Sequence, residues 1–158
     1  ERTRHQLRQV KQRVDIEDWL TPDELARVRE AVRQAEQRTS GEIRVHLDLA
    51  IMDDVLDHAA FVFNDLGMAH TQERNGVLLY VSVPGRKVAV VGDTGIHAKL
   101  GDAYWQSVLD VMLGHFREDR FCEGLCRGVH LLGEKLQEHF PFRRGDRNEL
   151  SDDISFGA

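Results

Sequence analysis

The chain has 158 residues, with 21 Lys+Arg against 27 Asp+Glu and a formal net charge of -6. This length predicts one domain, and a composition of 41% hydrophobic and 30% charged residues excludes a largely disordered chain. The acidic balance argues against non-specific binding to nucleic acid or to an anionic membrane, because both require a basic patch. The longest apolar run, Val77 to Val81, is far shorter than the roughly 20 residues of a membrane span.

The two cysteines, Cys122 and Cys126, lie too close together in the sequence for a disulfide between them to stabilise the fold. We therefore expect reduced thiols and a cytoplasmic location. The chain does not begin with a secretory signal pattern. The sequence leaves open whether a signal segment was removed before Glu1. We expect a basic leader over residues 1–18, a domain over 19–141, and a tail over 142–158 that either packs on the domain or binds a partner.

The first half of the domain predicts two helices around one strand. Thr21 and Glu24 form a capping-box pattern with Pro22 between them, which predicts a helix over about 22–38. Apolar residues alternate with polar ones over 43–49, the period of a half-buried strand. Helical spacing resumes over 53–66, and Gly67 follows as a stop signal.

The second half predicts a hairpin followed by two helices. The segment 76–83 is apolar on both faces, as in a central strand covered from both sides. A turn signal separates it from a strand over 87–91, and two helical stretches follow Gly95. The helix between the first two strands predicts a parallel crossover, while the short turn makes the last two strands antiparallel.

This topology brings three segments that are distant in the sequence to one edge of the sheet. They are residues 40–42, 74–76 and 92–95, each containing glycine. Glu42, Asn75 and Asp93 offer oxygen ligands there, and Asp102 could add a third carboxylate. Such ligands suit a hard divalent cation, Ca²⁺ or Mg²⁺, better than zinc. The alternative stays open that these are ordinary turn residues, with acidic side chains at strand ends for solubility.

At these positions the chain resembles the TPM domain family, named for a thylakoid lumen protein, a photosystem II repair protein and a nematode receptor modulator. The resemblance rests on the segments 39–45 (TSGEIRV), 73–78 (ERNGVL) and 92–96 (GDTGI). It extends from about Trp19 to the end of the chain, and the tail looks like that of a short, stand-alone bacterial branch.

The resemblance implies an α/β fold: a three-layer α/β/α sandwich with a Rossmann-like mixed sheet. It also implies a divalent cation at the loop edge, with Glu42, Asn75 and Asp93 at the family's motif positions. A plant relative has been assigned acid phosphatase activity, so a metal-dependent phosphatase is one implied function. Other relatives act in complex repair and receptor modulation, which implies a non-enzymatic module that binds a protein partner.

The residues themselves argue against two known kinds of phosphatase. Cys122 and Arg127 have the wrong spacing for a cysteine-dependent phosphatase, and Glu134 stands where a P-loop has its lysine. A metal route remains, in which Glu42 and Asp93 hold the cation that activates a water. Arg74 would then neutralise charge in the transition state. The oligomeric state is left open.

Overall fold

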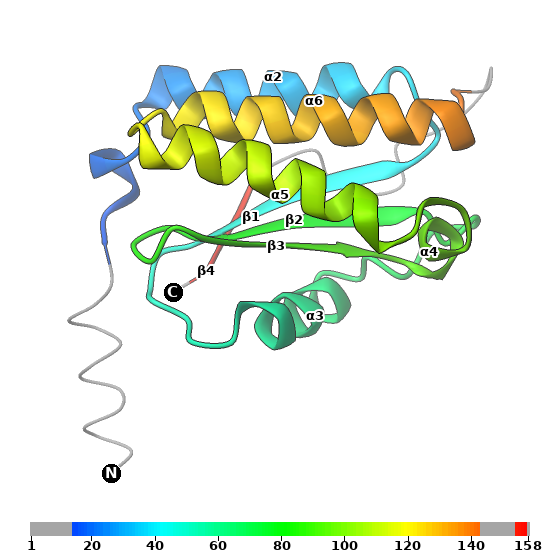
Figure 1. Ribbon diagram of the computed structural model, residues 1–158, viewed down its shortest axis with the longest axis horizontal. Coiled ribbons are helices and arrows are strands. Elements are labelled where there is room, and N and C mark those ends of the chain that lie inside the picture. Colours follow the sequence, from blue (N-terminus) through cyan, green and yellow to red (C-terminus); the bar gives the residue numbers. More distant parts are fainter. Residues whose placement is uncertain (1–13, 143–153, 158) are drawn as a thin grey trace, which may run out of the picture.

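The computed structural model describes residues 14–142 and 154–157 as a three-layer sandwich (Figure 1). In chain order its elements are η1 (Ile16–Asp18), α2 (Pro22–Glu36), β1 (Glu42–Asp48), α3 (Val55–Asp65), β2 (Gly76–Ser82), β3 (Lys87–Gly92), α4 (Thr94–Leu100), α5 (Asp102–Arg117), α6 (Phe121–His139) and β4 (Ser155–Gly157). Helices α2, α5 and α6 cover one face of the sheet, and α3 lies against the other face (Figure 1). The predicted α/β/α architecture is therefore confirmed.

The sheet has four strands in the order β3-β2-β1-β4. Strand β1 pairs in parallel with β2, beginning at Glu42 opposite Gly76, and in parallel with β4. Strands β2 and β3 are antiparallel. The parallel crossover and the single hairpin, both predicted from the order of the elements, are confirmed.

Local sequence signals explain why α2 begins at Pro22. The Thr21 hydroxyl accepts a 3.1 Å hydrogen bond from the Glu24 N–H, and the Glu24 carboxylate accepts a 3.0 Å bond from the Thr21 N–H. This reciprocal capping satisfies two N–H groups that a helix start would otherwise leave open. The apolar face of α2 then packs against α6 and the sheet.

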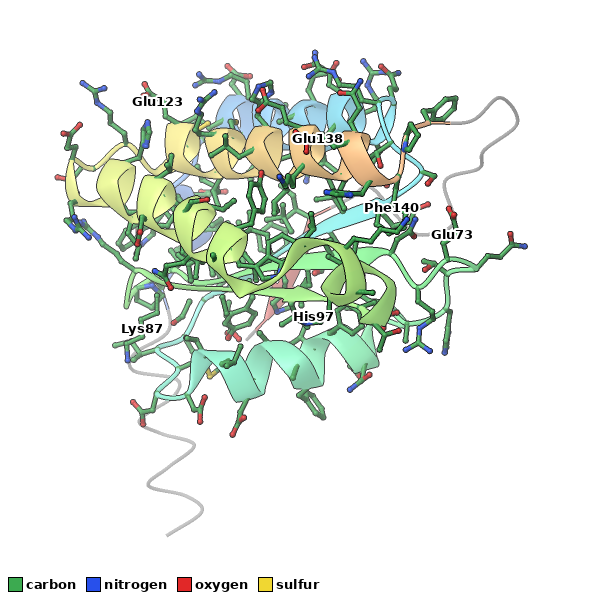
Figure 2. The ribbon with its side chains drawn as sticks, turned by 45° about the vertical axis from the view of Figure 1, so that its right-hand side comes forward. Glu73, Lys87, His97, Glu123, Glu138 and Phe140 are labelled. Atoms are coloured by element: carbon green, nitrogen blue, oxygen red, sulfur yellow. The ribbon has the colours of Figure 1, made fainter. Side chains whose placement is uncertain are left out.

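Apolar side chains fill both spaces beside the sheet. The larger core lies under α2, α5 and α6, and its residues include Val45, Leu79 and Leu125. A smaller core lies under α3 around Phe63 and Leu78. At the end of the molecule where the loops gather, Glu73 and Phe140 lie on the same side (Figure 2). The Ser40 N–H ties this end together by donating a 2.9 Å hydrogen bond to the Phe140 carbonyl.

Two parts of the secondary structure differ from the sequence prediction. The loop after β3 was predicted to lead to two helices, but a further helix, the seven-residue α4, precedes both of them and is capped by Asp93. No strand was predicted in the tail, yet Ser155–Gly157 forms β4 beside β1. Both elements are too short to show a periodic pattern, so tertiary contacts decide them.

The last residues of the predicted leader pack on the domain. The Val14 N–H donates a 2.7 Å hydrogen bond to the Leu49 carbonyl, and Val14 and Ile16 pack against the larger core. The rest of the predicted leader, residues 1–13, lies outside the described residues, as does most of the predicted tail, 143–153 and 158. None of the helices in the described part is both long and apolar enough to cross a membrane.

Candidate functional site

The three loop segments predicted to converge do meet at one edge of the sheet, called here the loop edge (residues 40–42, 73–76 and 92–95). Three backbone hydrogen bonds join them: Glu42 N–H to Asn75 O at 3.3 Å, Asp93 N–H to Gly76 O at 3.0 Å, and Gly95 N–H to Arg74 O at 2.9 Å. The backbone of the second segment is therefore bonded to both of the others. This arrangement follows from the parallel pairing of β1 with β2 and the antiparallel pairing of β2 with β3.

Arg74 and Asp93 form the main ion pair of the loop edge. The Arg74 Nε and a terminal guanidinium nitrogen donate to the two carboxylate oxygens of Asp93 at 2.7 and 2.8 Å. The Asp93 side chain is 4% exposed, whereas that of Arg74 is 49% exposed. These hydrogen bonds raise the pKa of Arg74. The buried carboxylate of Asp93 is thus neutralised by a guanidinium whose side chain is half exposed to solvent.

The Asp93 carboxylate has a second role as the cap of α4. Its Oδ1 accepts a 2.7 Å hydrogen bond from the Thr94 N–H. Arg74 itself has a φ of 51°, a left-handed backbone conformation that most side chains avoid. The ion pair thus joins a helix-capping carboxylate to a residue with a left-handed backbone.

Gly95 explains how closely the second and third segments approach. A Cβ at this position would lie 2.3 Å from the Glu73 carbonyl oxygen and 2.7 Å from that of Arg74. Both contacts are shorter than a side chain can tolerate, and both involve backbone atoms. Only glycine fits here, which explains the second glycine of the Gly-Asp-Thr-Gly sequence.

Asn75 is the most buried polar group of the loop edge, with 1% of its surface exposed. Its backbone N–H donates to the Thr71 hydroxyl at 3.1 Å, and its side-chain nitrogen lies 3.5 Å from Ser40 and from Glu73. Its side-chain oxygen Oδ1 is buried and has no hydrogen-bond partner among the residues the structure describes. Such an oxygen is a ready ligand for a cation or for a donor group.

The predicted metal ligands are therefore brought together only in part. Glu42 is buried at the start of β1, close to Asn75 through the backbone, while both oxygens of Asp93 already accept hydrogen bonds. Asp102 begins α5, and its side chain lies outside the described part of the structure. Within that part, no three His, Cys, Asp or Glu side chains surround a common point as metal ligands. The oxygen donors suit Ca²⁺ or Mg²⁺, but Asp93 could ligate only in place of Arg74.

Glu73 lay outside the segments predicted to meet at the loop edge, and Ser40, although within the predicted segment 40–42, was given no role there. The Ser40 hydroxyl donates a 3.0 Å hydrogen bond to a carboxylate oxygen of Glu73. The one sequence signal for Glu73 was its position next to the predicted Arg74. Glu73 and Ser40 add a carboxylate and a hydroxyl on the side where Asn75 points its amide nitrogen.

A second polar group under α3 was also missed: His46, Asp48, His58, Tyr80 and Ser155, called here the α3 polar cluster. Oδ2 of Asp48 lies 2.7 Å from the Tyr80 hydroxyl and 3.2 Å from Nε2 of His58. His46 stacks on Tyr80 at 5.6 Å between ring centroids, and its Nδ1 lies 2.7 Å from the Ser155 hydroxyl. Burial, together with the bond to Asp48, raises the pKa of Tyr80, and burial lowers that of His46.

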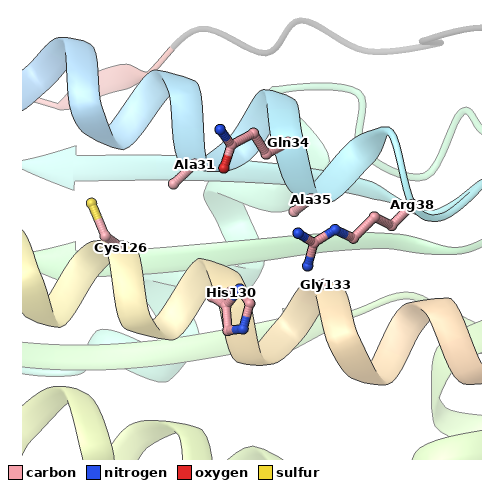
Figure 3. Close-up of a pocket in the computed structure, with 7 residues that line it drawn as sticks. All are labelled: Ala31, Gln34, Ala35, Arg38, Cys126, His130 and Gly133. Carbon is pink, nitrogen blue, oxygen red and sulfur yellow. The ribbon is translucent and has the colours of Figure 1, made fainter.

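A small groove lies between α2 and α6 (Figure 3). Its volume is about 200 Å³, and its floor contains the small residues Ala31, Ala35 and Gly133. Arg38 and His130 stand at its sides, and His130 pairs with Glu134 at 2.8 Å. Cys126 also lines it, and burial raises the pKa of this thiol to about 12. The groove therefore offers neither a reactive thiol nor a buried polar side chain, which leaves the loop edge as the better candidate.

No curated protein matches this chain. Its fold is similar to the NMR structure of the BA42 protein from the psychrophilic bacterium Bizionia argentinensis, with 38% identity, coverage of 90% of this chain and 99% of that one, and a TM-score of 0.83. It is also similar to the N-terminal domain of a protein from P. gingivalis, at 25% identity, 77% and 79% coverage and a TM-score of 0.63.

A third solved structure shares the fold alone. It is the N-terminal domain of a Corynebacterium glutamicum protein, with 10% identity, coverage of 85% of this chain and 79% of that one, and a TM-score of 0.57. The family model described as the TPM domain matches residues 14–135, which is more than half of the chain. This chain therefore belongs to the TPM domain family.

Proposed function

We propose that this TPM domain is a non-enzymatic binding module that takes a divalent cation, Ca²⁺ or Mg²⁺, at its loop edge. The observation that supports the proposal most directly is the buried side-chain oxygen of Asn75, which has no hydrogen-bond partner among the described residues. It belongs to the residue next to Arg74, the half-exposed cation that now neutralises the buried Asp93. The loop edge thus combines buried oxygen donors with a replaceable positive charge.

Arg74 acts in this proposal as the internal substitute for the bound cation. Its guanidinium can turn into water at little desolvation cost, because half of its side chain is already exposed. Asp93 would keep its bond to the Thr94 N–H through Oδ1 and offer Oδ2 to the ion. Glu42, Asn75 and Asp93 are the residues that would hold it. The ordered loops would then present a surface for a protein partner.

A second candidate function, a weak metal-dependent acid phosphatase, is favoured by one feature of Arg74. When released from Asp93, its guanidinium would stand at the loop edge, where it can bind phosphoryl oxygens through two parallel hydrogen bonds. A bound divalent cation supplies Lewis-acid polarisation of such oxygens. We favour binding over catalysis because Glu42, Asn75 and Asp93 are buried, so Arg74 is the group that a substrate could reach.

Titration of Ca²⁺ and of Mg²⁺ into the wild-type chain and three variants tests the proposal. The backbone amide shifts of Gly41, Asn75 and Asp93 should move with either ion and saturate. Arg74→Asn removes the competing cation and should tighten binding by about threefold to tenfold. Asp93→Asn should weaken it, although the amide still caps α4.

Arg86→Asn is the matched control for Arg74→Asn. Arg86 also has a left-handed backbone, with a φ of 53°, and pairs with Asp119 at 2.6 Å. This change relieves the same backbone conformation and breaks an ion pair, yet it should leave cation affinity unchanged. No amide shift at the loop edge at millimolar ion would overturn the proposal, and so would equal effects of the two arginine changes.

Hydrolysis of p-nitrophenyl phosphate under ion saturation separates the two candidates. A binding module gives no turnover above the buffer rate. A phosphatase gives turnover that falls in both Arg74→Asn and Asp93→Asn. Turnover that persists in both variants would argue against the loop edge as the source of any activity.

A further inference from the structure

The outer side of α3 carries the two most exposed large apolar side chains in the described part of the protein. Leu56 and Phe61 are 61% and 63% exposed, and Ile51, in the loop before the helix, is 38% exposed. The buried side of α3 packs on β2 and β3, and no described element covers its outer side (Figure 1). Two such side chains within two turns of one helix mark a candidate contact surface.

The same side of α3, called here the α3 outer face (the exposed side chains of residues 51–65), is acidic. Four exposed carboxylates accompany the apolar side chains: Asp53, Asp54, Asp57 and Asp65. No Lys or Arg occurs in the sequence from residue 45 to residue 73. Lys87 and Ile51 both lie within 4.0 Å of the point where a Gly85 Cβ would stand, which brings one positive charge to that end of the face. The acidic excess therefore selects a positively charged partner.

The N-terminal arm of the chain (residues 1–13) has the complementary composition. It carries five basic side chains against the single acidic residue Glu1: Arg2, Arg4, Arg8, Lys11 and Arg13. Leu7 and Val10 are apolar positions among them. A segment of this kind can place its charged ends on carboxylates while its apolar side chains and the stems of its arginines cover apolar surface.

The N-terminal arm joins the domain beside the loop that leads into α3. The Val14 N–H donates to the Leu49 carbonyl at 2.7 Å, and residues 50–54 connect Leu49 to α3. From η1 to Val14 the described chain leaves the layer of α2 and reaches the level of the sheet (Figure 1). Thirteen extended residues reach about 45 Å, whereas the 11 residues of α3 span about 17 Å. The arm is therefore long enough to reach every part of the α3 outer face.

A tethered arm has an advantage over a free partner at this face. Short tethers give effective concentrations in the millimolar range, so contacts that are weak one by one can hold the arm. Each exposed ion pair contributes little, and its contribution falls as salt screens the charges. Docking through several such pairs should therefore be reversible and sensitive to salt.

We propose that the α3 outer face is the docking surface for the N-terminal arm of the same chain. The basic side chains of the arm pair with the four aspartates, and Leu7 and Val10 cover Leu56 and Phe61. A basic segment of another protein would have to displace the arm, so the arm acts as an internal cover of this face. The inference does not depend on the cation proposed for the loop edge.

Backbone amide shifts of the ¹⁵N-labelled full chain test the docking. At about 0.01 M salt, Arg8→Gln combined with Lys11→Gln should shift the amides of Leu56, Asp57 and Phe61, because the arm leaves the helix. At about 1 M salt the screening length falls from about 30 Å to about 3 Å, so the difference between the wild type and this variant should disappear.

Arg117→Gln combined with Arg127→Gln is the matched control. It removes the same charge from exposed positions in α5 and α6, on the other face of the sheet, and should leave the α3 amides in place. An absence of any difference at α3 between the wild type and the arm variant would overturn the proposal, and so would an equal effect of the control pair.

Charge reversal distinguishes direct contact from a remote effect. Arg8→Glu with Lys11→Glu should release the arm, and so should Asp57→Lys with Asp65→Lys. The chain with all four changes should regain most of the salt-sensitive shift of the Phe61 amide. If the double change in α3 does not fold, Asp65→Lys alone serves, because a lysine suits the last turn of a helix. A combined variant that regains none of the shift would overturn the pairing of the arm with α3.

Dilution tests whether the arm docks on its own chain. The salt-sensitive shifts of the wild type should be the same at about 0.02 mM and about 0.5 mM protein, both below the effective concentration of a short tether. Shifts that grow with protein concentration would overturn docking within one chain and assign the arm to the α3 outer face of a second copy.

Discussion

The Tyr80 hydroxyl donates a 2.7 Å hydrogen bond to Oδ2 of Asp48, across the neighbouring strands β2 and β1. Both side chains are buried, on the side of the sheet that α3 covers. The bond holds the carboxylate in the place that excludes a side chain at Gly157. One hydrogen bond between neighbouring strands therefore links the small core under α3 to the edge where β4 docks.

Replacing Tyr80 with Phe should destabilise the protein by about 1.5–3 kcal/mol, because it removes a hydrogen bond to a buried charged group and leaves the carboxylate short of a donor. Urea unfolding measured by circular dichroism gives the difference in the free energy of unfolding. Tyr104→Phe is the control, since the Tyr104 hydroxyl bonds to the Leu131 carbonyl, a neutral acceptor in a half-exposed position. Tyr104→Phe should lower the free energy of unfolding by less than Tyr80→Phe does. Equal losses would contradict a special role for the bond to Asp48.

Stability should fall as the pH drops below 6.5, in a way that depends on His46. Burial lowers the pKa of His46 below its ordinary 6.5, with the charge of Asp48 opposing and those of His58 and Arg44 adding to the effect. The unfolded chain therefore takes up this proton first. The contribution is fully present above pH 6.5 and is lost between 6.5 and the lower pKa of the folded protein.

The comparison between wild type and His46→Gln isolates this contribution. The wild type should lose more stability than the variant between pH 7.5 and 5.5, because the variant has no imidazole to protonate. Denaturant unfolding at the two pH values measures it. His97→Gln, at an exposed position in α4, should keep the wild-type pH dependence. Parallel losses in His46→Gln and wild type would show that His46 does not carry the effect.

The two roles of Asp93 can be separated by two substitutions. Asp93→Asn keeps an oxygen for the Thr94 N–H but loses the charge that pairs with Arg74. Asp93→Ala loses both, so it should be about 1 kcal/mol less stable than Asp93→Asn, the usual value of a helix cap. Thermal unfolding of the pair measures the difference. Equal stabilities would show that the cap of α4 contributes nothing.

Two glycines should respond to alanine in opposite directions. Gly95→Ala places a Cβ against two backbone carbonyl oxygens and should destabilise by about 3 kcal/mol. Gly114 lies inside α5 with open space around the position of a Cβ, so Gly114→Ala should stabilise by about 0.8 kcal/mol through helix propensity. Chemical denaturation of both variants checks the pair. A stabilising Gly95→Ala would mean that the loops can separate without cost.

The loop edge could be predicted from sequence because it depends on topology alone. A helical crossover and a short turn determine which strand ends share an edge, and both leave clear local signals. The capping of α2 by Thr21 and Glu24 is equally local. The ion pair between Arg74 and Asp93 was not foreseen, because Asp93 had been assigned to a cation and Arg74 to the charge of a transition state.

The α3 polar cluster could not be predicted, since it joins residues from four elements. His46 and Asp48 looked like the solvent-facing positions of a half-buried strand, but both are buried. Their burial depends on α3 lying over Tyr80 and on β4 pairing beside β1, and neither contact has a local signal. The short β4 carries no periodic pattern of its own.

The antiparallel pairing of β2 with β3 has a consequence for the order in which the chain folds. Residues 83–86 close this hairpin locally, and hairpins of this kind form in roughly 1–10 μs. Strand β1 can join β2 only after the intervening segment with α3 has closed into a long loop, which slows the step. We expect the hairpin to form before β1 pairs with β2. The residues that flank the hairpin, Arg74 and Asp93, are then brought together before the neighbours of Glu42.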